Sequence, residues 1–199
     1  MGLLAPCNSL TSMKYIGMGV SHLLLTPSRM SVNNSMLYNF QKEILKKAEP
    51  SWLFALDTGT GKTILSIHHY LKYMEGEPVL IVAPAQKVKE GGWEREIQRV
   101  SDYYGIEIEY DIISYGVLAK KWDLYKGWFV IFDECHYVKN PTSQRGKAAL
   151  NLTRVSTNFS LLSATPSSNG WGDTINYFLM FGFYRNKTQF MREHAIYGT

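Results

Sequence analysis

A glycine-rich segment that ends in lysine and threonine is the part of the sequence best suited to bind a phosphate. Residues 57–63 read DTGTGKT and directly follow a short apolar run at 52–56. Glycines let the backbone wrap around an anion, so that main-chain amides and the positive end of the next helix point at it. In such a loop Lys62 would reach the β- and γ-phosphates of a nucleotide, and the Thr63 hydroxyl would ligate Mg²⁺. Leu56 stands where the strict motif has a glycine, so the match is to the relaxed form, and an ordinary glycine turn is the alternative.

A pair of carboxylates follows a second apolar run. Residues 128–132 lead into Asp133 and Glu134, and carboxylates at the end of a buried strand are costly unless they meet cations or take part in a reaction. In phosphoryl transfer the first of such a pair can hold Mg²⁺ and the second can polarise the attacking water. A solvated turn is the alternative. Cys135 and His136 lack further zinc ligands at suitable spacing, and adjacent side chains point apart, so neither a zinc site nor a Cys–His nucleophile pair is expected.

Apolar runs alternate with segments of helical periodicity, which predicts an α/β domain. The expected strands cover residues 52–56, 79–83, 110–114, 128–132 and 159–163. The expected helices cover residues 36–48, 64–74, 93–100 and 144–152, the first of them capped by residues 33–35. Most of these strands are continuously apolar, so we expect a doubly wound parallel sheet that binds ligands at the carboxyl ends of its strands. His68 and His69 are expected to be ordinary helix-surface residues.

Length and composition limit the class of protein. The chain has 199 residues, of which 45% are hydrophobic and 19% charged, so it can bury one substantial core but not two full-sized α/β domains. This composition excludes a disordered chain, and no apolar run approaches the ~20 residues of a membrane helix. Two cysteines cannot form a disulfide framework, which favours a reducing, cytoplasmic setting without a membrane partner. The net charge of +4 is compatible with a nucleic-acid partner but does not indicate one.

Residues 1–35 differ from the rest of the chain. They contain two charged residues, Lys14 and Arg29, and none of the 17 acidic residues. They match neither a secretory signal nor a myristoylation site. We therefore expect a poorly ordered extension, and a physiological start at Met30 or Met36 is the alternative.

Three motifs, in order along the chain, resemble the first RecA-like lobe of superfamily 2 helicases. They are DTGTGKT at 57–63, DECH at 133–136 and LSATP at 162–166. Further motifs resemble the Swi/Snf-like branch of that superfamily: LYNFQ at 37–41, W-x-x-E at 93–96, Ser-Tyr at 114–115 and H-x-x-K-N at 136–140. The resemblance covers about residues 36–190 and implies a RecA-like P-loop NTPase fold, with a mostly parallel sheet and helices on both faces.

The resemblance also implies roles for individual residues. Phosphate and Mg²⁺ binding would involve Thr58, Gly59, Thr60, Gly61, Lys62, Thr63 and Asp133. Gln41 would read adenine and Glu134 would activate water. The nucleotide state would be relayed to the DNA-contacting surface by His136, Ser163 and Thr165, and the DNA backbone would be contacted near Pro84, Ser114, Tyr115, Lys139 and Asn140. Core packing is the preferred interpretation for Trp93 and Phe178, and it is the alternative for Tyr115.

The function implied is that of the ATP-binding lobe of a DNA translocase, which couples Mg·ATP hydrolysis to movement on duplex DNA. In this family a second RecA-like lobe supplies arginines to the transferred phosphoryl group. Because no such motif follows, we expect that lobe on another chain or in a longer parent chain. Residues 36–184 would form the first lobe and residues 185–199 the start of the connection between lobes.

Some departures from the family pattern leave alternatives open. Thr58 and Thr60 are closer to helicases of other branches, the motif at 163–166 is SATP, and the connections are short. We expect such a compact version in a bacteriophage or mobile element, acting in the host cytoplasm. A catalytically silent module that binds DNA or a protein partner, and a lobe of a restriction-type DNA motor, are the alternatives.

Overall fold

The structure is a computed structural model that describes residues 36–74, 76–167 and 170–194. The expectations for residues 1–35, including the helix cap at 33–35, and for residues 195–199 lie outside this part of the chain. Within it, no helix is long and apolar enough to cross a lipid bilayer.

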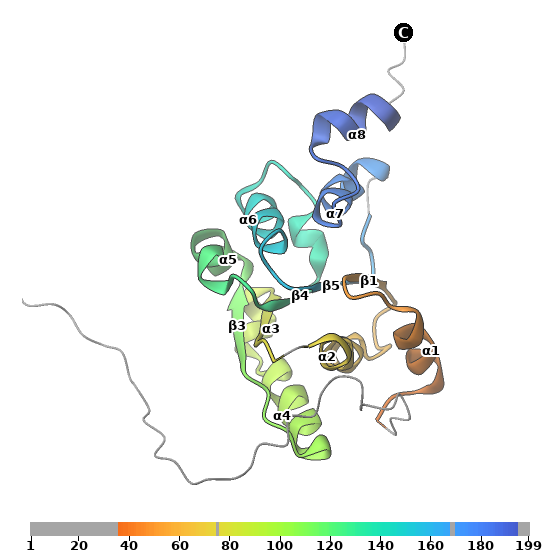
Figure 1. Cartoon of the computed structure of the whole chain (residues 1–199), viewed down its shortest axis with the longest axis vertical. Helices are drawn as coiled ribbons and strands as arrows, with labels where there is room; N and C mark the ends of the chain where they lie inside the picture. The colour runs from red at the N-terminus through yellow and green to blue at the C-terminus, as the bar shows by residue number, and fades with distance from the viewer. Residues whose placement is uncertain (1–35, 75, 168–169, 195–199) are drawn as a thin grey trace, which may run out of the picture.

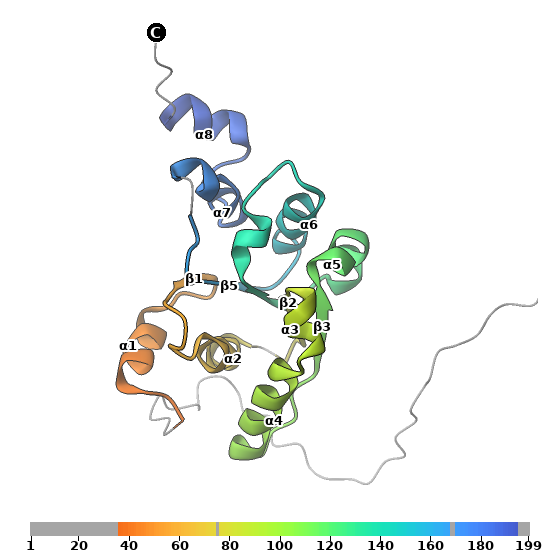
Figure 2. The ribbon, with the colours of Figure 1, turned by 180° about the vertical axis from the view of Figure 1, so that it is seen from behind.

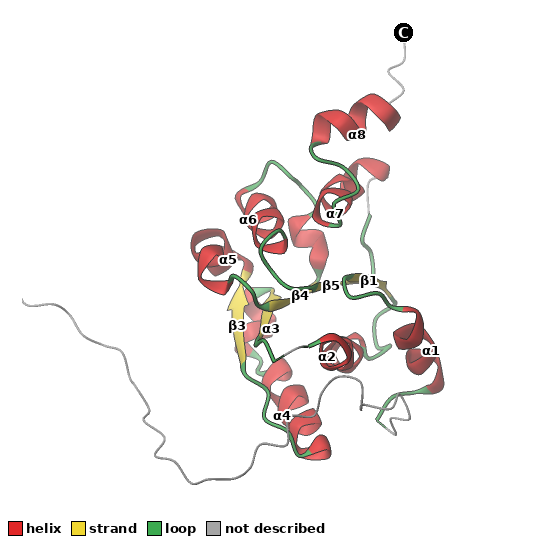
Figure 3. Cartoon of the chain, viewed as in Figure 1, coloured by secondary structure: helices red, strands yellow, loops and turns green. Residues whose placement is uncertain are grey.

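Five strands form one parallel sheet, which confirms the expected α/β, RecA-like architecture (Figure 3). They are β1 (Trp52–Ala55), β2 (Val79–Ala83), β3 (Tyr110–Ser114), β4 (Phe129–Asp133) and β5 (Phe159–Ser163). Their order across the sheet is β1-β5-β4-β2-β3, and every neighbouring pair is parallel. All five strands therefore end at the same edge of the sheet.

Helices cover both faces of this sheet (Figures 1 and 2). The helices are α1 (Asn39–Lys47), α2 (Lys62–Tyr73), α3 (Ala85–Lys89), α4 (Gly92–Tyr104), α5 (Tyr115–Lys121), α6 (Gln144–Thr153), α7 (Ile175–Met180) and α8 (Lys187–His194). Three 3₁₀ segments are η2 (Trp122–Tyr125), η3 (Cys135–Val138) and η4 (Trp171–Thr174). Helices α1, α2 and α4 lie on one face, and α5, α6 and α7 lie on the other. Helix α8 packs beyond α7, away from the sheet.

The core has two layers because the strands are buried on both sides. Side chains alternate along β2, so that Val79 and Ile81 pack in the layer of α1, α2 and α4, whereas Leu80 and Val82 pack in the layer of α5, α6 and α7. All five residues of β2 are buried, as are all five of β4. This explains why these strands are continuously apolar in the sequence.

Several element boundaries differ from those expected. Helix α1 begins at Asn39 rather than at residue 36, after a capping box between Tyr38 and Gln41. Helix α4 does not end at Ser101 but runs on to Tyr104, where Gly105, with φ of 62°, adopts the left-handed conformation that closes helices. The short helices α3 and α5 were not expected, because five to seven residues are too few to give a clear periodicity.

The expectation that His68 and His69 are surface residues is wrong. Residues 64–71 of α2 are all buried, because α2 packs on the sheet and is flanked by α1 and α4. The His69 ring spans two elements: its Nδ1 lies 2.8 Å from Ser160 Oγ in β5, and its Nε2 lies 2.7 Å from the Glu49 carbonyl oxygen. Burial lowers the pKa of His69 to about 4, so the ring is neutral in the folded protein.

Candidate functional site

The motifs singled out in the sequence meet at the carboxyl edge of the sheet. The glycine-rich loop follows β1, Ser163 ends β5, and Asp133 ends β4. Pro84 follows β2, and Ser114 ends β3. The strand order therefore places the phosphate loop at one end of the edge, the carboxylates near its middle and the Pro84 and Ser114 segments toward the other end.

The glycine-rich loop has the backbone geometry of a phosphate cradle. Gly59 and Gly61 have φ angles of 75° and 73°, in the left-handed region that favours glycine. Gly61 also lacks room for a side chain, because an added Cβ would lie 2.6 Å from Gln41 Nε2. Lys62 Nζ donates hydrogen bonds to the carbonyl oxygens of Leu56, at 2.9 Å, and Asp57, at 2.8 Å. The ammonium group thus lies across the base of the loop, where it can exchange these carbonyls for phosphate oxygens.

Gln41 supports this loop from α1. Its side chain is 1% exposed. Its Nε2 donates to the Thr60 carbonyl oxygen at 2.8 Å, and its Oε1 accepts a hydrogen bond from the Tyr38 main-chain amide at 2.8 Å. Gln41 therefore fixes the loop to the capping box of α1. Recognition of adenine by Gln41 stays a prediction, and it would require the amide group to exchange these bonds.

The acidic pair lies in a strained turn beside a lysine. Glu134 has a φ angle of 53° and is the one residue other than glycine with positive φ in the described chain. Such a backbone costs about 1–3 kcal/mol, and it is typically retained where it aims a side chain at a functional site. Lys87 Nζ lies 3.1 Å from Asp133 Oδ2 and 3.1 Å from Glu134 Oε1. Trp93 Nε1 donates to the same Asp133 Oδ2 at 3.1 Å.

Lys87 is a functional candidate that was not identified from the sequence, and Trp93 is a candidate for which core packing was the preferred interpretation. Trp93 is buried in the core, as preferred, but its indole also holds the candidate Mg²⁺ ligand. Partial burial lowers the pKa of Lys87, but the two carboxylates outweigh that effect and raise it, so the side chain is a cation. No motif marks Lys87, because its partners lie 46 and 47 residues further along the chain.

The donor set fits Mg²⁺ bound together with a nucleotide. Thr63 and Asp133 line the same hollow, of about 310 Å³, beside the phosphate loop. A hydroxyl and a carboxylate with phosphate oxygens form the kind of oxygen shell that Mg²⁺ prefers. The described residues contain no group of three or more His, Cys, Asp and Glu that could hold a metal by themselves. This set suits a cation that arrives with phosphates rather than a structural zinc.

Cys135 is part of the core. Its side chain is fully buried, and burial raises the pKa of the thiol to about 12. A thiol that is not ionised near neutral pH is a poor nucleophile and a poor metal ligand. The chemistry of this turn therefore belongs to its carboxylates.

The residues expected to relay the nucleotide state lie next to the acidic pair or to the loop. His136 Nδ1 is 3.4 Å from Glu134 Oε2, so the imidazole faces the carboxylate expected to activate water. Ser163 is buried, and its Oγ accepts a hydrogen bond from the Thr165 amide at 3.1 Å. The Ser163 carbonyl oxygen accepts from the Leu56 amide at 3.2 Å, which ties this motif to the start of the phosphate loop. The relay itself stays a prediction.

The residues expected to contact DNA differ in burial and in the partners that they already have. Ser114 caps α5, and the Asn140 carboxamide oxygen accepts from the Thr142 amide at 2.9 Å within a turn. Lys139 forms an ion pair with Asp173 at 2.8 Å, so its charge is partly neutralised. Tyr115 is buried, and its hydroxyl donates to the Asp133 carbonyl oxygen at 2.7 Å. The alternative of core packing therefore describes the Tyr115 ring, which does not face solvent.

A basic hollow beside Ser114 was not identified from the sequence. It measures about 560 Å³ and is lined by α5 and by the start of α6, with the exposed Lys120 and Arg145 among its residues. The two capping serines, Ser114 of α5 and Ser143 of α6, also line it. Two exposed cations beside serine hydroxyls suit a phosphate backbone.

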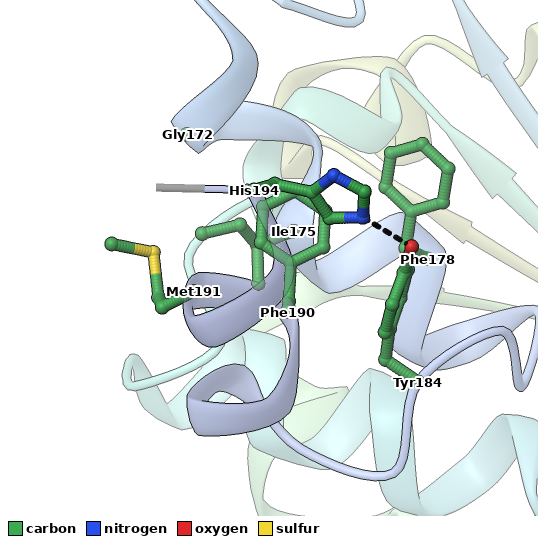
Figure 4. Close-up of a pocket in the computed structure, with 7 residues that line it drawn as sticks. All are labelled: Gly172, Ile175, Phe178, Tyr184, Phe190, Met191 and His194. Carbon is green, nitrogen blue, oxygen red and sulfur yellow. Dashed lines mark hydrogen bonds between the residues drawn. The ribbon is translucent and has the colours of Figure 1, made fainter. Parts of the chain in front are cut away.

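A further hollow, of about 580 Å³, lies between α7 and α8 (Figure 4). It is lined mainly by apolar side chains, among them Ile175, Phe178 and Phe190. Tyr184 is hydrogen-bonded to His194 at its rim. Phe178 packs against Phe190 with ring centroids 5.6 Å apart, which agrees with the interpretation of Phe178 as a core residue. None of the residues assigned to the phosphate loop or the acidic pair lines this hollow.

Comparisons with known proteins agree with the motifs. A family described as the res subunit of type III restriction enzymes matches residues 28–113. A *Caenorhabditis elegans* homolog of SWI/SNF-related matrix-associated actin-dependent regulator of chromatin subfamily A-like protein 1 is 27% identical over 153 residues, which are 66% of this chain and 22% of that protein. Its *Bos taurus* counterpart is 31% identical over 131 residues, 58% of this chain and 14% of that protein.

The fold is shared with a solved structure, the *Sulfolobus solfataricus* SWI2/SNF2 ATPase core in complex with dsDNA. The match has a TM-score of 0.63 and 24% sequence identity, and it covers 80% of this chain and 39% of that one. The chain spans 22% and 14% of the two curated relatives and 39% of the solved core. The chain is thus similar in sequence to SWI/SNF-related proteins and to the res subunit of type III restriction enzymes, and it shares the RecA-like fold of a SWI2/SNF2 ATPase core.

Proposed function

We propose that this chain is the ATP-binding lobe of a DNA translocase and that it binds Mg·ATP at the carboxyl edge of its sheet. The observation that carries the proposal is the hollow shared by Thr63 and Asp133, next to a glycine loop that has a lysine across its base. A hydroxyl and a carboxylate on one hollow, with the Lys62 ammonium group in the adjoining loop, are the groups that phosphoryl transfer requires.

Each residue of the proposed site has a distinct task. Lys62 and the loop amides would hold the β- and γ-phosphates, and Thr63 with Asp133 would hold Mg²⁺, which when bound neutralises phosphate charge. Glu134 would orient the attacking water and accept its proton. His136, whose Nδ1 lies 3.4 Å from Glu134 Oε2 without a hydrogen bond to it, is close enough to respond to that carboxylate, as the proposed relay of nucleotide state requires. An arginine from a second RecA-like lobe, on another chain or in a longer parent chain, would complete the site.

Duplex DNA is the proposed partner of the remaining part of the edge. The proposal is supported by the basic hollow with Lys120 and Arg145, which lies beside the Ser114 segment. The solved core that shares this fold was determined in complex with dsDNA. Contacts of cations and amides with the phosphate backbone would give binding that tolerates any sequence, as a translocase needs.

Nucleotide binding by a Lys62→Ala variant tests the proposal. We expect its affinity for Mg·ATP, measured by calorimetry, to fall about tenfold to 100-fold, because a charged contact with phosphate is lost. Lys72→Ala is a matched control: Lys72 Nζ also donates to main-chain carbonyl oxygens, those of Leu45, Lys46 and Ala48, at the other end of α1 from Gln41. The control should keep its affinity, and equal affinity in Lys62→Ala would contradict the proposal.

ATP hydrolysis with and without duplex DNA distinguishes an active lobe from a silent one. Turnover that DNA stimulates and that Glu134→Gln abolishes, while nucleotide binding is retained, would support the proposed motor. Absence of turnover with Mg·ATP binding retained would show that the site is incomplete without the second lobe. DNA binding that survives Lys62→Ala in a chain that binds no Mg·ATP would favour a silent binding module. The match to restriction-enzyme res subunits keeps a restriction-type motor as a second candidate, because it would use the same phosphate and acidic motifs.

A further inference from the structure

Lys87 occupies the oxygens that a divalent cation would need. Its Nζ lies 3.2 Å from Asp133 Oδ1, 3.1 Å from Asp133 Oδ2 and 3.1 Å from Glu134 Oε1. Trp93 Nε1 holds Asp133 Oδ2 from the other side at 3.1 Å. Both oxygens of Asp133 are therefore already in contact with donors.

We propose that Lys87 is a displaceable counter-ion of the acidic pair: it holds Asp133 and Glu134 in the nucleotide-free lobe, and the divalent cation that accompanies the nucleotide displaces it. The proposal rests on the proposed function, since it assumes that Mg·nucleotide binds at this pair. Asp133 is only 4% exposed, and a carboxylate so buried needs a compensating charge before any cation arrives.

Displacement follows from charge and from space. An ammonium group and a divalent cation repel each other, so binding of the divalent cation to these carboxylate oxygens disfavours the contact with Lys87. The Lys87 side chain is 42% exposed and lies in the hollow shared by Thr63 and Asp133, so it can leave toward solvent. Trp93 is buried and keeps its bond to Asp133, so the carboxylate stays in position during the exchange.

The exchange would also reach the DNA-facing part of the edge. Lys87 belongs to α3, whose N-cap is Pro84, one of the positions expected to face DNA. While Lys87 is bound to β4, it ties α3 to the acidic pair; once displaced, it leaves α3 free to shift. Lys87 is thus a positioning residue, since it acts through Asp133 and Glu134 and not on the nucleotide itself.

Binding of Mg·ADP to Lys87→Met, measured by calorimetry, tests the proposal. Removal of a competing, half-exposed ion pair should tighten Mg·ADP binding about threefold to tenfold. The same variant should melt at a lower temperature than wild type in EDTA, because the acidic pair has lost its counter-ion. Lys87→Arg keeps the charge and should restore affinity and melting temperature toward wild-type values.

Two controls separate displacement from general loosening of the site. Lys89→Met removes an exposed lysine from the same helix and should leave both measurements unchanged. Trp93→Phe removes the other donor to Asp133 without removing a competing charge, so it should not tighten Mg·ADP binding.

Equal or weaker binding by Lys87→Met would overturn the proposal, with Lys87 then acting as a ligand of the nucleotide or as a purely structural residue. Absence of Mg·ADP binding in wild type and Lys87→Met alike would overturn the proposed function as well.

Discussion

His69 makes the stability of the lobe sensitive to pH. Burial lowers its pKa to about 4 from an unfolded value near 6.5, so between these values the unfolded chain binds more protons than the folded one. The stabilisation is therefore complete above pH 6.5 and is lost as the pH falls toward 4. We expect this one residue to cost about 2 kcal/mol of unfolding free energy between pH 7 and pH 5.

Urea denaturation of wild type and His69→Gln at pH 7 and pH 5 checks this prediction. The variant should be less stable at pH 7, because it gives up at least one of the bonds to Ser160 and Glu49. Its loss of stability between the two pH values should nevertheless be smaller than that of wild type by the contribution of His69. The same loss in both proteins would contradict a neutral, buried His69.

The parts of the candidate site that consist of residues adjacent in the chain could be predicted from the sequence. Lys62 and Thr63 are adjacent in one loop, and Asp133 and Glu134 are adjacent after one strand, so residue type and spacing identify them. Lys87 contacts Asp133 across 46 residues, and no short pattern records such a contact. The same limit explains the wrong expectation for His69, whose neighbours are supplied by β5 and by the turn before β1.

At the scale of elements, the start of α6 is docked unusually closely on the turn that follows the acidic motif. A Cβ added to Gly146 would lie 2.0 Å from the Asn140 carbonyl oxygen, a main-chain atom that cannot move aside cheaply. Ser143 strengthens the same contact, since its Oγ accepts from the Gly146 amide at 3.0 Å and donates to the Asn140 carbonyl oxygen at 2.9 Å. We therefore expect Gly146→Ala to destabilise the lobe by about 2 kcal/mol or more.

Gly116→Ala provides the matched control, because it is also a glycine within the first turn of a helix. Its added Cβ would meet Ser114 Oγ at 3.8 Å, an ordinary van der Waals distance. Alanine should therefore stabilise α5 by up to about 1 kcal/mol, since glycine is the poorer helix former. Denaturant midpoints of the two variants should move in opposite directions, and a shift in the same direction would show that α6 does not depend on this close approach.

The arrangement of elements was easier to predict than their ends. All five strands lie within one residue of their expected positions, and the three that are buried at every position, β2, β4 and β5, leave nearly continuous apolar runs. The ends of α1 and α4 depend on a capping box with Gln41 and on Gly105, features of two or three residues that periodicity does not resolve. Helices α3 and α5 are shorter than the window in which a helical period can be recognised.

For the whole molecule, the proposed function divides one edge of the parallel sheet between two kinds of ligand. The loop after β1 and the carboxylates at the end of β4 would bind the nucleotide, whereas the segments after β2 and β3 lie toward the opposite end of the edge. Lys87, after β2, bonds to the carboxylates of β4, so the two parts are joined through neighbouring strands. If Lys87 is displaced as proposed, a shift of α3 against the end of β4 would couple nucleotide binding to DNA binding.

This division predicts that DNA affinity and nucleotide affinity can be changed separately. Lys120→Ala and Arg145→Ala should each weaken binding of duplex DNA by a similar factor for all sequences and should reduce the slope of log K against log salt concentration by about 1. Arg154→Ala is the control, since Arg154 is an exposed arginine at the other end of α6. Fluorescence anisotropy at several salt concentrations measures the slopes, and Mg·ADP calorimetry on the same variants should give wild-type values. Unchanged slopes in Lys120→Ala and Arg145→Ala would show that DNA binds another face of the lobe. A loss of nucleotide affinity in the same variants would show that the two parts of the edge are not independent.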